Sequence, residues 1–186
     1  MKMLEAIKKD LKGVRNIWKE YWALYGGFRA LFSSTYFFVA LFITVVNFGA
    51  WIVSGWWDVV ISAAPTILGF TLAGLAVFLG MDTGFSKFMA RAEEGKKSPF
   101  MILVSAFVHF IVVQCAALLY SLTMKSLSFT LEGMPAWYYQ LVFFGNRVFW
   151  FLGYFLFVYA IVLIFSATFA IFRATKWYGL YVQKDE

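Results

Sequence analysis

The stretch PTILGFTLAGLAVFLGM, residues 65–81, decides how this chain folds. It contains no charged side chain, and its small residues recur at steps of three and four, so on a helix they share one face. That stripe comprises Thr66, Gly69, Ala73, Ala76 and Gly80. Because apolar side chains gain nothing by leaving one hydrocarbon environment for another, small residues in register let two helix backbones approach closely in a bilayer. The stripe therefore predicts a helix–helix contact.

The composition is that of an integral membrane protein. Of the 186 residues, 62% are hydrophobic and only 14% are charged, outside the range of soluble domains. Four uncharged windows each hold more than the roughly 20 residues that a membrane-crossing helix needs. We predict one all-α, polytopic membrane domain over residues 1–186, with four transmembrane helices at about 31–53, 65–81, 99–124 and 148–172.

Three local features set the predicted boundaries of these spans. Pro65 suits the first turn of the second span, where its missing N–H is not needed. Ser98 followed by Pro99 reads as the N-cap and first residue of the third span. A single helix over residues 135–173 would be about 58 Å long, too long for the membrane, so we predict a break near Gly145 and Asn146.

Lysine and arginine predict the orientation. Fourteen of the 16 lie in the arm over residues 1–29, the connection 82–98 or the tail after residue 172. The positive-inside rule then places both termini and the middle loop in the cytoplasm of a multi-pass bacterial inner-membrane protein. This topology accounts for the net charge of +6, so no nucleic-acid partner is needed.

The arm over residues 1–29 is predicted to be an amphipathic, interfacial helix. Its apolar positions are Ile7, Leu11, Val14, Trp18, Tyr21 and Tyr25. A basic face between them suits anionic headgroups, which favours the lipid bilayer as the partner of the arm. Docking of a cytoplasmic protein partner is the alternative.

Three polar side chains lie inside predicted spans: Asn47, His109 and Gln114. Asn47 and Gln114 fall at similar depths, so their amides are expected to meet and fix the register of two helices. For His109 a neutral, hydrogen-bonded packing role is favoured over proton transfer, because no span carries a carboxylate to pair with it.

Charged residues also mark the outer boundary of the spans. Arg147 is expected to reach the headgroups with Asp58 or Glu132 as a partner, and a role in anion selectivity or gating is the alternative. The single cysteine, Cys115, excludes an intrachain disulfide. The sequence predicts no catalytic, cofactor or metal site, and no enzyme activity.

Assembly is the remaining prediction, and the sequence leaves two versions open. The stripe on residues 65–81 is either a seam inside the four-helix bundle or the contact of a homo-oligomer, such as a tetrameric ring. The oligomer version predicts a pore-type effector, in the manner of an ion channel, or a membrane sensor. The alternative is a non-conducting scaffold that recruits a cytoplasmic partner.

The motif PTILGFTLAGLAVFLG, followed by a basic cytoplasmic loop, resembles a pattern in small four-span bacterial inner-membrane proteins. Some of these are membrane components of anti-phage (antiviral defence) systems such as Kiwa. The resemblance covers the second span and the topology, and no functional residue is carried over from it. It implies an inner-membrane sensor or effector that oligomerises, perturbs the membrane and works with a cytoplasmic partner.

Overall fold

The computed structural model is helical, without a β-strand among the residues it describes. Those residues are 2–81, 83–91, 97–129 and 131–183. Three helices are long and apolar enough to cross a membrane: α5 (Trp56–Leu79), α7 (Pro99–Ser126) and α8 (Ala136–Val182). The prediction of an all-helical membrane protein is therefore confirmed at this level.

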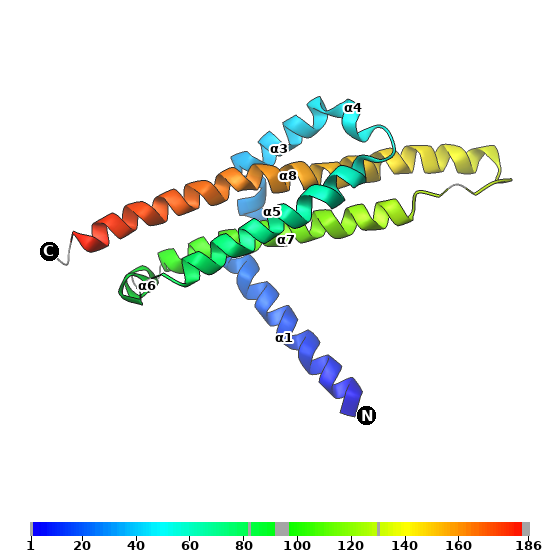
Figure 1. The fold of residues 1–186 in the computed structure, drawn as a ribbon. Helices are drawn as coiled ribbons and strands as arrows, with labels where there is room; N and C mark the ends of the chain where they lie inside the picture. Colours follow the sequence, from blue (N-terminus) through cyan, green and yellow to red (C-terminus); the bar gives the residue numbers. More distant parts are fainter. Residues whose placement is uncertain (1, 82, 92–96, 130, 184–186) are drawn as a thin grey trace.

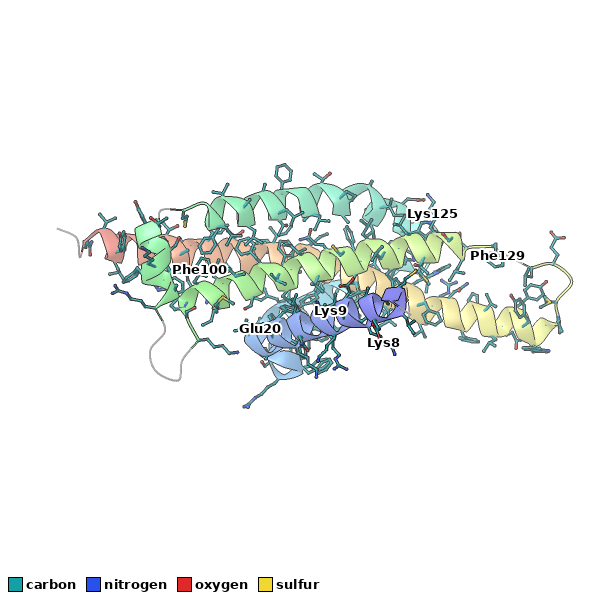
Figure 2. The ribbon with its side chains drawn as sticks, turned by 90° about the horizontal axis from the view of Figure 1, so that it is seen from below. Lys8, Lys9, Glu20, Phe100, Lys125 and Phe129 are labelled. Carbon is teal, nitrogen blue, oxygen red and sulfur yellow. The ribbon has the colours of Figure 1, made fainter. Side chains whose placement is uncertain are left out.

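The three long helices form the body of the molecule (Figure 1). α7 packs against both α5 and α8, and α3 (Thr35–Val46) packs against α8. The short helix α6 (Thr83–Ala90) lies at the same end as the C-terminus, while the loop from α7 to α8 lies at the opposite end. In Figure 2, Phe100 marks the first of these ends, and Lys125 and Phe129 mark the second.

The window predicted as the first span, residues 31–53, is a broken helix. It divides into α2 (Gly27–Phe32), α3 and α4 (Phe48–Trp51). A side chain bonds the backbone at the break near Asn47: the indole N–H of Trp51 donates a hydrogen bond to the carbonyl of Thr44 at 2.8 Å. With 12 residues, α3 rises only about 18 Å, so it is too short to cross a core of about 30 Å as one helix.

The second span begins nine residues earlier than predicted, because α5 starts at Trp56 and Pro65 lies inside it. An interior proline removes one backbone hydrogen bond, a defect that membrane helices tolerate. Burial explains why the helix continues, since Trp57 and Val60 before the proline are 5% and 0% exposed. Their packing against the other helices outweighs the lost hydrogen bond.

The start of α7 agrees with the sequence. Ser98 is the N-cap, and its side-chain oxygen accepts a hydrogen bond from the N–H of Met101 at 3.2 Å. Pro99 then occupies the first helical position, where no intrahelical donor is needed. The helix ends at Ser126, two residues beyond the predicted end of the third span.

The predicted break near Gly145 and Asn146 is wrong, because α8 is one continuous helix of 47 residues. Glycine costs an interior helical position about 1 kcal/mol relative to alanine, and asparagine less, so neither residue ends a helix by itself. A length of about 70 Å exceeds the membrane, but a helix does not have to end where the hydrocarbon ends. The prediction wrongly assumed that a helix can be no longer than the thickness of the hydrocarbon core.

Among the described glycines, Gly153 of α8 has the least room for a side chain. A Cβ atom at this position would clash with Trp56 of α5 and would lie 2.7 Å from the ring of Tyr120 of α7. Only glycine fits this contact without displacement of a neighbour. Gly153 therefore sets the spacing of all three long helices at this level.

The N-terminal arm is the helix α1 (Lys2–Tyr25), and it leaves the bundle at an angle (Figure 1). Its side chains from residue 3 to residue 20 are exposed, whereas Tyr21 is buried against α7. The arm is thus helical over most of the predicted range and is attached through its C-terminal end. Its contact with a membrane surface stays a prediction.

Candidate functional site

The predicted small-residue stripe lies on the outer side of α5. All five members are exposed: Thr66, Gly69, Ala73, Ala76 and Gly80. A Cβ atom at Gly69 would meet no other atom within 4 Å. At 3.6 residues per turn, the buried Val60, Thr71 and Phe78 lie on roughly the opposite side of the helix. A seam inside the bundle is therefore wrong, and contact between copies stays a prediction.

His109 joins three helices at one buried point. Its ring is 4% exposed, and its Nδ1 atom lies 2.7 Å from the hydroxyl of Tyr21 of α1. Its Nε2 atom lies 3.1 Å from the hydroxyl of Tyr159 of α8. The ring of Tyr25 stacks on the imidazole, with 3.8 Å between centroids and 15° between planes. The histidine of α7 therefore links the arm to the bundle.

One assignment of hydrogen positions gives the His109 ring nitrogens and the hydroxyl of Tyr159 consistent donor and acceptor roles. Tyr21 donates to Nδ1 of His109, Nε2–H donates to Tyr159, and Tyr159 donates to the hydroxyl of Tyr25. Burial raises the pKa of Tyr21, and it also raises the pKa of Tyr25 despite the opposing hydrogen bond from Tyr159. Both phenols of α1 stay protonated at neutral pH. The cluster is therefore a neutral hydrogen-bonded chain that fits a packing and anchoring role.

The end of α1 is held by two further features next to this cluster. Gly26 adopts the left-handed conformation with φ of 108°, and its N–H donates to the carbonyl of Trp22 at 3.2 Å. The ammonium group of Lys97 donates to the carbonyls of Ala23 and Leu24 at 2.6 and 3.0 Å. A cation at this position also suits the negative end of the helix dipole.

The predicted pairing of Asn47 with Gln114 is wrong. The amide nitrogen of Gln114, which is 2% exposed, donates instead to the hydroxyl of Thr71 at 3.0 Å. Thr71 in turn donates to the carbonyl of Ile67 on its own helix at 2.8 Å. Asn47 is exposed at the end of α3. The two amides were expected at the same depth in the membrane, but they do not lie on sides of their helices that face each other.

Asp58 forms an ion pair at the end of the bundle opposite α6, but its partner is Lys125 rather than Arg147. The carboxylate and the ammonium lie 2.8 Å apart, with both side chains largely exposed. The guanidinium of Arg147 lies over the rings of Phe143 and Trp150, at 4.5 and 5.4 Å from their centroids. Such cation–π contacts stabilise the guanidinium against aromatic rings of its own helix and do not require a carboxylate partner.

The described residues do not bring together three metal-ligating side chains from histidine, cysteine, aspartate and glutamate. Cys115 is a free, half-buried thiol of α7. The chemistry that the buried groups support is hydrogen bonding between helices.

Sequence reasoning missed three partners of His109 and the lysine beside them. Tyr21 and Tyr25 were placed on the apolar face of the arm, but that face was assigned to lipid. Tyr159 lies among apolar residues in the sequence and was not singled out. A buried tyrosine hydroxyl usually has a hydrogen-bond partner, so a tyrosine within a span could have indicated such a contact. Lys97 was counted only for orientation, because no local pattern indicates a contact with residues 23 and 24.

Comparisons with known proteins return no significant match, whether to a family model, a curated protein or a solved structure. The function is therefore inferred from the geometry of the chain.

Proposed function

We propose that this chain is the subunit of a homo-oligomeric membrane protein whose α5 helices pack along the exposed stripe. One observation carries the proposal: the five small residues lie on the side of α5 that its own bundle leaves uncovered. Lipid gains little from small side chains, whereas a neighbouring helix gains close dispersion contacts from them. The stripe is thus better explained by a second copy than by acyl chains.

We propose that this assembly acts as a pore-type effector or a membrane sensor of the bacterial inner membrane, and that its activity arises where the copies meet. Inside one copy, His109 and Gln114 are bonded to side chains of neighbouring helices, which leaves them poorly suited to line a water path. A path between copies would be lined by the stripe and gated by dewetting. A role in anti-phage defence, as the resemblance implies, belongs to the same proposal.

Substitution of the stripe tests the assembly. We expect Gly69→Leu and Ala73→Leu to reduce the purified complex to smaller species, measured by light scattering in detergent. Because both positions are exposed within one copy, the thermal unfolding temperature of the separated chain should stay unchanged. Ala116→Leu, at an exposed position of α7, makes the same change in size as Ala73→Leu away from the stripe and serves as the control.

An oligomer that survives both stripe substitutions would overturn the assembly proposal, and so would a wild-type chain that is monomeric in nanodiscs. Conduction is tested separately by release of a dye from liposomes that contain the purified protein. Leakage that disappears with Gly69→Leu would support a path between copies. Membranes that stay sealed would remove the pore version and leave the sensor.

A second candidate function rests on α1. Its apolar side chains are exposed along residues 3 to 20, and the helix projects away from the bundle (Figure 1). An amphipathic helix of this kind fits recruitment of a cytoplasmic partner by a non-conducting scaffold. Deletion of residues 2–18 leaves the His109 contact in place, so a recruiter should lose its partner in a pull-down while a pore should keep its leak.

A further inference from the structure

A mixed polar and aromatic cavity lies at the outer end of the bundle, far from the His109 cluster. It has a volume of about 430 Å³, within the range of small-molecule sites. It lies between the start of α5, the loop after α7 and the first half of α8, at the end of the molecule marked by Lys125 and Phe129 in Figure 2. The residues that line it on the helices are Trp57, Tyr138, Tyr139, Val142, Asn146 and Trp150.

Several hydrogen-bonding groups of this cavity are unused within the described part of the chain. Trp57 is only 5% exposed, yet its indole N–H is neither bonded nor sealed off by protein, unlike that of Trp56. The amide of Asn146 and the hydroxyl of Tyr138 are half-buried in the cavity wall and form no hydrogen bond there. These groups supply donors and acceptors that a ligand can satisfy.

The charge distribution selects an uncharged ligand. Among the described residues, the lining contains no charged side chain. The two nearby cations lie outside the lining: Lys125 pairs with Asp58, and Arg147 keeps its charge but lies over the rings of Phe143 and Trp150. An ionic ligand would lose its hydration here without gaining a partner of opposite charge. A simple acyl chain would leave the polar groups of the wall unpaired.

We propose that this cavity binds an uncharged sugar ring. The C–H face of a sugar suits the ring of Trp150, which is half-buried in the cavity wall. Trp57 is only 5% exposed and supports that ring from an edge-to-face position, with 5.9 Å between the centroids. The hydroxyl groups of a sugar both donate and accept, which matches the amide of Asn146, the phenol of Tyr138 and the indole N–H of Trp57. The site is independent of the assembly along α5.

Binding to the full chain in nanodiscs of phosphatidylcholine tests this site. The probes are the methyl glycosides of glucose, galactose and N-acetylglucosamine, followed by saturation-transfer NMR and tryptophan fluorescence. We expect at least one probe to bind, and Asn146→Ala and Tyr138→Phe each to weaken its affinity by about tenfold. Trp137→Leu, an exposed tryptophan outside the cavity, should change the affinity by less than about twofold.

A charged sugar provides an independent test of the proposal. Methyl glucuronide has the same ring with a carboxylate, and we expect it to bind at least about tenfold more weakly than the glucoside. Failure of all three neutral glycosides to bind at up to about 50 mM would overturn the proposal. Equal affinity for the glucuronide, or binding unchanged by Asn146→Ala in a variant that keeps its unfolding temperature, would overturn it as well.

Discussion

Gly153 is the described glycine at which the bundle leaves least room for a side chain. A Cβ atom there would clash with Trp56 and would lie 2.7 Å from Tyr120, so an added methyl group has to displace two rigid aromatic rings. We expect Gly153→Ala to destabilise the fold by about 1–3 kcal/mol, the usual cost of overpacking. The measurement is the shift in thermal unfolding temperature in detergent.

Gly145 of the same helix is the matched control. A Cβ atom there would meet no neighbour within 4 Å, so Gly145→Ala gains helix propensity without a clash. We expect it to stabilise the chain by about 0.5–1 kcal/mol. Equal destabilisation by the two substitutions would show that the tight contact at Gly153 is not the cause.

The hydrogen bonds of His109 predict that the arm detaches when they are removed. His109→Leu leaves the hydroxyls of Tyr21 and Tyr159 without their imidazole partner, each at a cost of about 1–3 kcal/mol if it stays buried. Release of α1 lets Tyr21 return to water, so we expect undocking in place of global unfolding. Faster amide hydrogen exchange over residues 21–25, with slow exchange retained in α7, is the expected result.

Tyr36→Phe is the control, because it removes a polar group that lies outside the His109 cluster. Tyr36 is half-buried beside the bundle and its hydroxyl forms no hydrogen bond with a described residue. Exchange over residues 21–25 should therefore match that of the wild type. An arm that stays protected in His109→Leu would indicate that stacking and apolar contacts alone hold it.

Residue by residue, the sequence indicated that polar groups in the spans need partners but did not identify the partners. His109 is buried and bonded through both ring nitrogens, as the cost of an unpaired polar group in hydrocarbon requires. Gln114 is buried and bonded through its amide nitrogen, whereas its Oε1 atom has no partner among the described residues. The partner of Gln114 depends on which sides of α5 and α7 face each other. That rotation is set by packing around Gly153 and the aromatic rings near it, which no local pattern encodes.

At the scale of elements, α1 depends on a residue that is distant in sequence. The ammonium of Lys97 donates to two carbonyls in the last turn of α1, those of Ala23 and Leu24. We expect Lys97→Ala to lower the stability of this helix end by about 0.3–1 kcal/mol, because the group is exposed and screened by solvent. Hydrogen exchange over residues 21–25 should rise only slightly, by far less than in His109→Leu.

Lys87→Ala is the control for this lysine. Lys87 is an exposed residue of α6 and forms no ion pair or hydrogen bond with a described residue, so the arm should not respond to its loss. An equal response to the two lysine substitutions would point to the overall charge of this end of the molecule. The contact with the α1 carbonyls would then be unimportant.

The positions of the three long helices followed from composition, whereas most of their ends did not. Caps with a local chemistry, such as Ser98 and Pro99, were predicted correctly. Pro65 and Gly145 are also helix-breaking types, yet both lie inside helices, because burial and the surrounding span offset their modest cost. The break at Asn47 is accompanied by a hydrogen bond from the indole of Trp51 to the carbonyl of Thr44, a side-chain contact that hydropathy does not report.

At the scale of the whole molecule, residues 27–51 decide the topology. Three long helices alone would place the two ends of the chain on opposite sides, whereas the distribution of lysine and arginine favours the same side. A broken helix can cross a membrane if its backbone groups are bonded. At the breaks, the N–H of Ser34 bonds Leu31 at 3.2 Å and the N–H of Asn47 bonds Ile43 at 2.9 Å.

We therefore expect residues 27–51 to cross as a fourth, interrupted span and both termini to lie in the cytoplasm. Fusions in bacterial cells measure this, because a green fluorescent protein matures only inside and alkaline phosphatase is active only outside. Fluorescence is expected from fusions at either terminus, and phosphatase activity from an insertion after Glu132. An active phosphatase at the N-terminus, with a fluorescent C-terminus, would show that the broken segment returns to the side it entered from and that α5, α7 and α8 are the full set of crossings.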